Sequence, residues 1–287
     1  MREAERFEAL QDFAAVGKLY QAQLMDPSWR RYPDRETCPW DGIGLFLWSY
    51  AFERQGRRPD YSPVAADVVQ ELKAEGFRID QPEAATEAWH RFSKQLGNDR
   101  LNIANNPMAP KGSPYQRKGR ERQSVTRSPS AIQVASQLGR SIVAHVLDLL
   151  REDQPKRAHA LVAGMNGVGD KIASLFLRDV ASYYELNVDT DRHLLQPVDT
   201  WIQRATGPCL NVSEKKDVAR AIVEACQACN VNPEHVNNGM WYFGAMVAQS
   251  TYRLRQAVES RPRFWSMTRE HVSALGDVVL AYREMPP

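Results

Sequence analysis

The amino-acid sequence predicts an all-α protein, and two features of the chain support this fold class. Apolar residues recur at three- and four-residue spacing through most of the 287 residues, which is the pattern of helices with one buried face. No segment shows a convincing alternation of apolar and polar residues, as a half-buried strand would. With 43% hydrophobic and 25% charged residues, a chain of this length buries a sizeable core in one or two domains.

The first predicted part of the chain, residues 1–106, is expected to be helical. Asp26-Pro27 is expected to end its first helix, and Ser62-Pro63 places a capping serine and a proline where its third helix begins. The second helix is the most apolar and is predicted to lie in the core. The helices expected in this part cover residues 6–24, 42–54, 63–76 and 83–96.

Residues 107–130 lack helical periodicity, so we expect a basic linker or loop there. The stretch from Lys111 to Arg127 carries about +5, which leaves about −3 for the remainder because the net charge is +2. Such a stretch is either a solvated tether or a mobile cationic strand that neutralises the phosphates of a nucleic acid. The basic residues at its centre are Arg117, Lys118, Arg120 and Arg122.

The third part, residues 131–212, contains the turn around which the chain is predicted to be organised. Gly167 and Gly169 flank Val168 between two predicted helices, the second of which begins at Lys171. Glycine tolerates the backbone angles of a tight hairpin, and the exposed N–H groups of such a turn suit a phosphate. The alternative is a plain helix-to-helix turn. The helices expected in this part cover residues 130–151, 154–162 and 171–184, with another beginning at Trp201.

The last part, residues 213–287, is predicted to hold helices over 213–229, 233–258 and 266–282. Cys226 and Cys229 lie three residues apart and would share one face of a helix. They are either metal ligands or small buried hydrophobic residues. The four cysteines are too few and too dispersed for a secreted disulfide scaffold.

Nothing in the sequence predicts a membrane or secreted protein. The N-terminal stretch MREAERFEAL lacks the apolar core of a signal peptide, and no stretch reaches the length of a membrane span. We therefore expect a cytoplasmic protein with no membrane partner. We also expect a monomer.

Two short motifs resemble those of a known superfamily, the helix-hairpin-helix DNA glycosylases, which include endonuclease III and the 8-oxoguanine glycosylases. The matching residues are Gly167, Val168, Gly169 and Lys171, followed by Pro197, Val198 and Asp199. The resemblance implies a two-lobed helix-hairpin-helix fold with the active site in the cleft between the lobes. In that fold residues 213–287 would pack back on the N-terminal part and line the base pocket. The implied partner is double-stranded DNA that contains a modified base.

The superfamily also bears on cofactors. Members with an iron–sulfur cluster need four grouped cysteines after the essential aspartate, whereas only three cysteines follow Asp199 here. We therefore expect no cluster, no other metal and no cofactor.

The hairpin lysine is the nucleophile of the bifunctional members, which makes Lys171 the candidate nucleophile. A base has to leave the duplex stack before an enzyme can reach it. The amine would attack the sugar carbon that bears the base, forming a Schiff base that allows strand cleavage by elimination. The amine must be neutral for this, and partial burial at a helix start would favour the neutral form. The alternative role for Lys171 is a phosphate contact.

The second motif makes Asp199 the candidate for the essential aspartate. Its carboxylate would stabilise positive charge on the sugar or relay the proton that activates the nucleophile. The other interpretation, a helix N-cap, is compatible with this role because a cap holds the carboxylate in place. Ten residues earlier, Asp189 lies in the sequence Val-Asp-Thr, which also surrounds Asp199. Asp199 is preferred because an apolar helix face follows it and Pro197 precedes it.

Among subfamilies the chain is most similar to the archaeal 8-oxoguanine glycosylases, over most of its length apart from the linker. The resemblance implies that Trp241 stacks on the flipped base and that Tyr61 supplies a second aromatic ring, although either ring would also suit a core. Leu175 lies one helical turn after the nucleophile. The implied pocket residues are Trp241, Asn237, Tyr61, Ser28, Leu175 and Pro197.

Two pocket positions depart from that subfamily, which has an acidic residue where this chain has Asn237 and a glutamine where it has Ser28. An asparagine offers one donor and one acceptor and suits the edge of cytosine at least as well as that of guanine. We therefore expect a glycosylase, with accompanying AP-lyase activity, that excises 8-oxoguanine or a hypermodified cytosine such as that of phage DNA. Its role would be DNA repair or antiviral defence. The alternative is a non-catalytic helix-hairpin-helix DNA-binding protein, which needs neither Lys171 nor Asp199.

Overall fold

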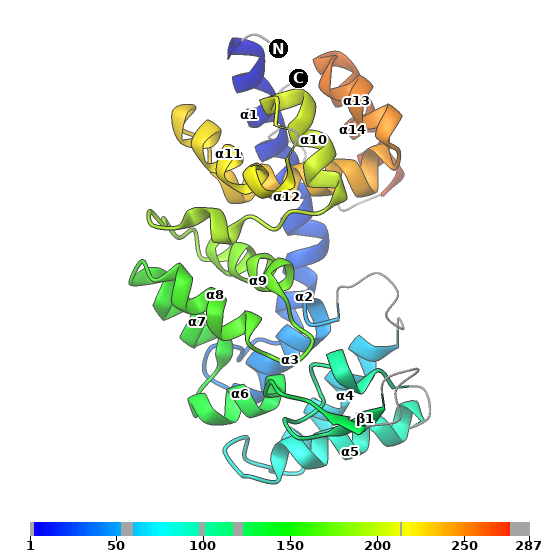
Figure 1. Cartoon of the computed structure of the whole chain (residues 1–287). Helices are drawn as coiled ribbons and strands as arrows, with labels where there is room; N and C mark the ends of the chain where they lie inside the picture. The colour runs from blue at the N-terminus through cyan, green and yellow to red at the C-terminus, as the bar shows by residue number, and fades with distance from the viewer. Residues whose placement is uncertain (1–2, 53–59, 98–100, 117–122, 213, 276–287) are drawn as a thin grey trace. The chain divides into compact units, whose positions relative to one another are not determined.

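The computed structural model describes residues 3–52, 60–97, 101–116, 123–212 and 214–275. The chain is mostly helical, with 69% helix and 2% strand, which confirms the predicted all-α class. It divides into two compact units (Figure 1). Unit 1 contains Met1–Pro27 and Ala181–Pro287, and unit 2 contains Ser28–Val180.

Unit 1 is built from both ends of the chain. Its elements are α1 (Glu3–Tyr20), the π-helical η1 (Gln21–Met25), the 3₁₀ turn η4 (Arg192–Leu195), α10 (Thr200–Leu210), α11 (Lys215–Ala228), α12 (Pro233–Tyr242), the π-helical η5 (Phe243–Ala248), α13 (Thr251–Val258) and α14 (Arg261–Ala274). A further helix, α2 (Asp26–Arg30), crosses the boundary between the units.

The close crossing of α1 and α12 joins the two ends of the chain within unit 1. Gly17 and Gly239 stand at this crossing, and a Cβ atom on Gly239 would overlap the carbonyl group of Phe13. A Cβ on Gly17 would likewise overlap the carbonyl of His235. Glycine is therefore required at both positions, because a packed interior leaves no room for an added methyl group.

Aromatic rings fill the core of unit 1 beside this crossing. The rings of Phe243 and Phe264 stack with their centroids 4.1 Å apart, and Phe13 meets Phe264 edge-on at 5.2 Å. Such offset and edge-on pairs contribute about 0.5–1.5 kcal/mol beyond the burial of their area. They bring together α1, η5 and α14.

Unit 2 contains the middle of the chain. Its elements are α3 (Pro39–Ser49), α4 (Tyr61–Ala74), α5 (Ala84–Leu96), the 3₁₀ turn η3 (Ile103–Asn105), β1 (Pro114–Gln116), β2 (Gln123–Val125), α6 (Ala131–Leu138), α7 (Ile142–Arg151), α8 (Pro155–Ala163) and α9 (Asp170–Tyr183). The last helix continues into unit 1 beyond Val180.

The apolar helix α3 lies in the core of unit 2, as its sequence predicts. Residues 40–47 of this helix are all buried. Phe46 and Tyr50 each place their ring centroid 5.1 Å from that of Phe176 on α9. Trp29 donates a hydrogen bond from Nε1 to the hydroxyl of Tyr50 at 2.9 Å. These contacts fix the helix that follows the predicted hairpin.

Several predicted helix ends are wrong, because a local backbone turn or a tolerated proline overrides the apolar period. The helix expected over 130–151 is two helices, since Gly139 adopts a left-handed φ of 62° between α6 and α7. Gln249, with φ 55°, separates η5 from α13 within the expected helix 233–258. Pro27 does not end the first helical stretch, because α2, which contains it, follows the π-helical turn η1 without a break.

Three further expectations about element boundaries need correction. The helix α4 begins at Tyr61, so Ser62 lies inside its first turn rather than at its cap. The last described helix begins at Arg261 rather than at 266. Within 107–130, β1 and β2 form a short antiparallel pair in which Tyr115 lies opposite Ser124. Three-residue strands are too short to produce a recognisable alternation.

The α1–α12 crossing predicts a large effect of one methyl group. Gly239→Ala should lower the free energy of unfolding by about 1–3 kcal/mol, because the added carbon overlaps the backbone of Phe13. Gly207→Ala on α10 is the control, since its Cβ would meet only Val212 O at 3.9 Å. That control should be neutral or stabilising by up to about 1 kcal/mol. Urea unfolding of both variants measures the difference, and equal stabilities would contradict the packing described.

Candidate functional site

The predicted hairpin is a tight turn between α8 and α9 in unit 2. Gly167 has a φ of 70°, in the left-handed region that favours glycine. A Cβ atom there would also overlap the backbone carbonyl of Asn105. The first glycine of the motif is therefore required by backbone angle and by space.

Asn166 anchors this turn to the rest of unit 2. Its Nδ2 donates to the carbonyl oxygens of Asn106 at 2.9 Å and Ile103 at 3.2 Å. Its backbone N–H donates to the carbonyl oxygen of Pro129 at 2.7 Å. The side chain is 5% exposed, so these bonds are shielded from water. The segment that precedes the basic linker and the end of the linker itself thus support the hairpin.

The second half of the turn offers hydrogen-bond donors to solvent. Within the described chain, the backbone N–H groups of Gly169, Asp170 and Lys171 have no acceptor in hydrogen-bond distance. Lys171 is exposed and forms no ion pair with another described residue. The partial burial expected for Lys171 is therefore not observed. Free N–H groups beside a cation are suited to binding a phosphate.

Asp199 is the N-cap of α10 in unit 1, which confirms the capping interpretation. Its Oδ1 accepts hydrogen bonds from the backbone N–H groups of Trp201 at 2.8 Å and Ile202 at 3.0 Å. Its Oδ2 forms no hydrogen bond with any described residue, and the side chain is half-buried. One oxygen is held while the other remains available. Asp189, by contrast, is exposed and accepts from Nδ2 of Asn187 at 2.9 Å.

A buried ionic network holds the segment that leads to Asp199. The Glu234 carboxylate on α12 is fully buried and accepts from Nη2 of Arg192 at 2.6 Å and from its Nε at 3.0 Å. It also accepts from Nε2 of Gln196 at 2.9 Å. Asn237 adds a bond from its Nδ2 to the carbonyl of Pro197 at 3.3 Å. The stretch between η4 and α10 is therefore tied to α12.

Arg192 and Glu234 are not predicted as functional residues by the sequence. Each looks like an ordinary surface charge in the sequence, and 42 positions separate them. The one local signal is the position of Glu234 in the first turn of a helix whose remaining residues are mostly buried. That signal does not predict a partner.

The predicted pocket residues of unit 1 occupy different environments. Trp241 is half-buried and meets Tyr20 edge-on with ring centroids 5.8 Å apart. Asn237 is fully buried, and its donor is used by Pro197. Reading a base edge would require Asn237 to exchange that bond. Of the predicted pocket residues, the structure brings Asn237 and Pro197 into contact.

In unit 2, Tyr61 belongs to an aromatic cluster. It is 5% exposed and meets Phe52 and Phe92 with ring centroids 5.6 and 5.7 Å apart. This environment is that of a core residue. Ser28 on α2 and Leu175 on α9 are half-buried.

Asn238 has an unusual environment that the sequence analysis missed. Its side chain is fully buried, and neither Nδ2 nor Oδ1 has a hydrogen-bond partner among the described residues. Each unsatisfied buried group of this kind costs about 1–3 kcal/mol. No local signal distinguishes it from its neighbour Asn237.

Cys209 and Cys226 are buried, whereas Cys38 and Cys229 are half-buried. Burial raises the pKa of Cys209 to about 12 and raises that of Cys226 well above its usual range. Both thiols are therefore protonated at neutral pH. Across the residues that the structure describes, no group of three or more His, Cys, Asp or Glu side chains is arranged to hold a metal ion.

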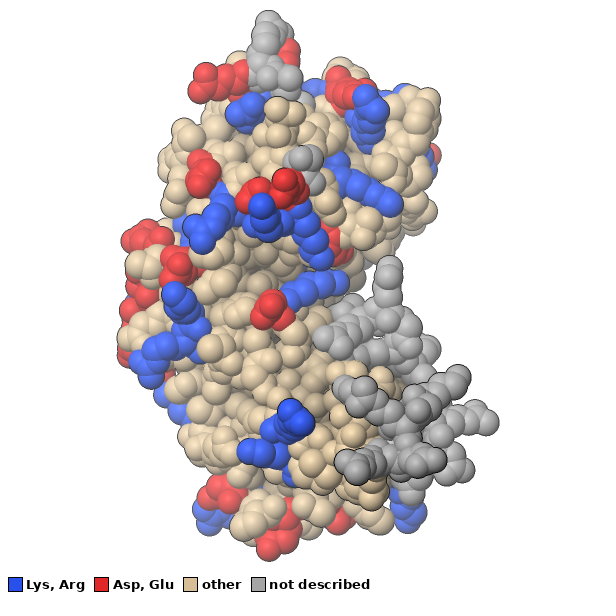
Figure 2. All heavy atoms as spheres, viewed as in Figure 1, with Lys and Arg blue, Asp and Glu red and all other residues tan. Residues whose placement is uncertain are grey.

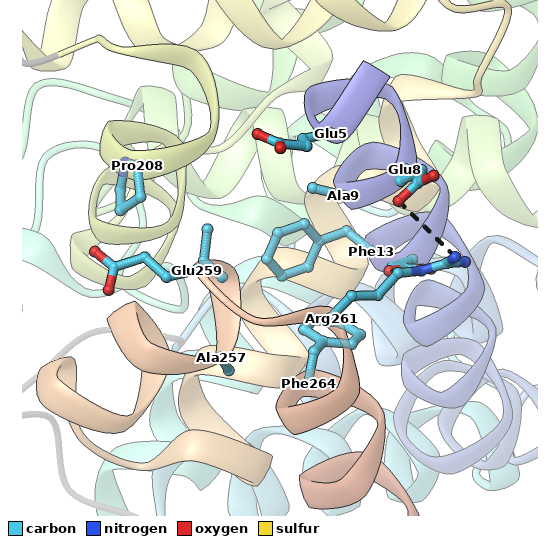
Figure 3. Close-up of a pocket in the computed structure, with 11 residues that line it drawn as sticks. Glu5, Glu8, Ala9, Phe13, Pro208, Ala257, Glu259, Arg261 and Phe264 are labelled. Carbon is cyan, nitrogen blue, oxygen red and sulfur yellow. Dashed lines mark hydrogen bonds and ion pairs between the residues drawn. The ribbon is translucent and has the colours of Figure 1, made fainter. Parts of the chain in front are cut away.

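A pocket of about 420 Å³ lies between α1, α10, α13 and α14 in unit 1 (Figure 3). The rings of Phe13 and Phe264 line it, and Arg261 donates from Nε to Oδ2 of Asp12 at 2.9 Å. None of the predicted site residues lines this pocket. Its charged side chains are Glu5, Glu8, Asp12, Glu259 and Arg261.

The charge distribution does not by itself identify a nucleic-acid surface. On the face in Figure 2, lysine and arginine side chains lie singly or in small groups with acidic side chains among them. The predicted DNA-binding residues Arg117, Lys118, Arg120 and Arg122 lie outside the described residues. Local geometry therefore has to support any assignment of a DNA contact.

Comparison with known proteins places few constraints on function. The chain is 26% identical to an uncharacterised protein of Methanocaldococcus jannaschii over 155 aligned positions, which cover 40% of this chain and 36% of the relative. The chain thus matches little more than a third of that relative's length. No protein-family profile matches the chain, and no solved structure does. None of the described helices is long and apolar enough to cross a membrane.

The hairpin geometry predicts that two glycine-to-alanine substitutions lower the stability by different amounts. Gly139→Ala should cost about 1 kcal/mol of stability, because Gly139 has a left-handed φ of 62° with nothing near its Cβ position. Gly167→Ala should cost distinctly more, since the added carbon also overlaps Asn105. Thermal or urea unfolding of the two variants compares them. A smaller loss for Gly167→Ala would show that space does not limit this turn.

Proposed function

We propose that this protein is a DNA glycosylase with a two-lobed helix-hairpin-helix architecture, which excises a modified base in a cleft between the lobes. Lys171 is the nucleophile and Asp199 assists the departure of the base. The observation that best supports this assignment is the Asp199 carboxylate, with one oxygen held by the start of α10 and the other without a hydrogen bond to any described residue. A preorganised charge of this kind is effective against charge that develops in a transition state.

The reaction follows from the two side chains. The neutral amine of Lys171 attacks C1′ of the nucleotide as the bond to the base breaks, and the Asp199 carboxylate stabilises the positive charge that develops on the sugar. The base leaves with a proton that originates on the attacking amine, and opening of the sugar ring gives a Schiff base with the lysine. Loss of a proton from C2′ then breaks the C3′–O bond by elimination, and the downstream strand leaves with a 5′ phosphate. Because Lys171 is exposed in the free protein, bound DNA has to exclude water from the amine.

The hairpin supplies the second support for the proposal. The N–H groups at residues 169–171 have no acceptor among the described residues, and Asn166 supports the turn. Such a turn would hold a phosphate without reading bases, which suits an enzyme that recognises a modified nucleotide in many sequence contexts. A non-catalytic DNA-binding protein would use the same turn, and in that case Lys171 would contact a phosphate.

Two classes of base remain as substrates in this proposal, 8-oxoguanine and a hypermodified cytosine of phage DNA. The first corresponds to DNA repair and the second to antiviral defence. Incubation with a duplex that contains 8-oxoguanine opposite cytosine, and separately with phage DNA that contains hydroxymethylated or glucosylated cytosine, distinguishes them. Mass spectrometry of the released base gives the answer. If neither base is released, the proposed function is wrong.

The lysine chemistry predicts a covalent complex that borohydride traps. Borohydride reduces the Schiff base to a stable amine, so protein and DNA with an abasic site should migrate together on a denaturing gel. Lys171→Gln should abolish the trapped band because an amide cannot form a Schiff base. Lys156→Gln, which changes another exposed lysine of the same unit, should leave the band unchanged. Trapping that survives Lys171→Gln would show that a different amine is the nucleophile.

The aspartate prediction uses a substitution that retains the helix cap. Asparagine caps a helix as well as aspartate does, so Asp199→Asn should fold normally. It should lower the single-turnover rate of base excision by about 10²- to 10⁴-fold, with little change in DNA affinity. Asp189→Asn is the matched control and should retain the wild-type rate. The opposite pattern would assign the essential carboxylate to Asp189.

A further inference from the structure

A shallow groove follows one face of α10 in unit 1 and begins beside Asp199. Its volume is about 760 Å³. The residues that line it recur at helical spacing and include no carboxylate. They are Thr200, Gln203, Arg204, Gly207, Asn211 and Val212. Apart from Thr200, which follows Asp199 directly, none of these residues belongs to the two motifs found in the sequence.

Arg204 is positioned in this groove by an aromatic platform. Its guanidinium carbon lies 5.5 Å from the centroid of the Trp201 ring. Trp201 in turn lies against Gly244 of η5, where a Cβ atom would come 3.0 Å from the ring. The Trp201 ring is thus packed against the backbone of η5 and offers a face to the guanidinium of Arg204.

The charge of Arg204 is uncompensated within the described chain. Its side chain is exposed and forms no ion pair with a described residue. In unit 1 this contrasts with Arg192 and Arg261, which are neutralised by Glu234 and Asp12. A guanidinium that is held in place with its donors free is suited to an oxygen-rich anion such as a phosphate.

The length and composition of the groove indicate an extended ligand. From Thr200 to Asn211 a helix rises about 16 Å, which is the length of several nucleotides along a strand. Hydroxyl and amide groups at Thr200, Gln203 and Asn211 are able to bond phosphate or sugar oxygens. Gly207 presents no side chain, and the space above it is open, so a strand is able to approach the helix backbone.

We propose that this groove, the α10 groove, binds the sugar–phosphate backbone of the DNA strand next to the nucleotide on which Asp199 acts. Arg204 contacts a phosphate, and Trp201 holds its guanidinium in place. The inference rests on the proposed glycosylase function, because it assumes that DNA is the partner. It adds to the hairpin a second, structurally separate backbone contact.

The salt dependence of DNA affinity tests the role of Arg204. For a duplex that carries an uncleavable abasic-site analogue, Arg204→Gln should reduce the slope of log affinity against log salt by about 0.9, because the protein then neutralises one phosphate fewer. Arg263→Gln is the matched control, since Arg263 is exposed on α14 and outside the groove. Its slope should equal that of the wild type. An unchanged slope for Arg204→Gln would overturn the proposal.

A second variant tests the groove without removing a native side chain. Gly207→Glu adds a carboxylate where the Cβ has room, and it should weaken DNA binding more than Arg204→Gln does. Ala228→Glu on α11 adds the same charge at an exposed position outside the groove lining and controls for the change in net charge. Equal effects of the two glutamates would contradict a backbone contact at α10.

The outcomes separate this inference from the proposed function. Failure of the wild-type protein to bind DNA would overturn both. If borohydride traps the complex and DNA binding is normal, but the α10 variants have the wild-type salt slope, the proposed DNA contact at the α10 groove alone is wrong. A deoxynucleoside monophosphate is the comparison ligand. If Arg204→Gln weakens binding of the monophosphate but leaves the DNA slope unchanged, the groove takes a free nucleotide and the DNA assignment is wrong.

Discussion

The crossing of α1 over α12 is the constraint on which unit 1 depends. It brings the first helix of the chain against a helix more than two hundred residues later, and it does so through the backbones of Gly17 and Gly239. Because the two helices touch at backbone level, α12 has little freedom to rotate or slide. The side chains of α12 are therefore held in place, and they position the segments that pack around this helix.

Among the side chains of α12, Glu234 has the largest effect on the path of the chain. A carboxylate that is fully buried has to be paired, and Arg192 and Gln196 together supply three hydrogen bonds to it. Loss of one partner of such a pair typically costs about 3–5 kcal/mol because the other charge stays buried. The network thus sets where the chain runs between η4 and α10. The position of Asp199 follows from this path and from its own bonds to the start of α10.

The hairpin of unit 2 is organised differently, because its contacts are almost all to backbone atoms. Gly167 removes a side chain where Asn105 approaches, and Asn166 satisfies three backbone carbonyl groups around the turn. The N–H groups of residues 169–171 have no acceptor among the described residues, so a ligand is able to accept hydrogen bonds from them. The α10 groove shares this property at one side chain, since the guanidinium of Arg204 forms no ion pair with a described residue.

The sequence by itself determined the features that depend on neighbours along the chain. Helical periodicity predicted the all-α class, the glycine spacing predicted a strained turn at Gly167, and the position of Asp199 before an apolar face predicted a helix cap. Only the tertiary structure decided the Arg192–Glu234 pair, the burial of Asn237 and Asn238, the exposure of Lys171 and the platform under Arg204. Propensity and capping act over a few residues and leave a local pattern, whereas ion pairing and burial are set by which distant segments meet. For the same reason the break at Gln249 escaped prediction, because its left-handed backbone angle interrupts an apolar pattern that continues on both sides.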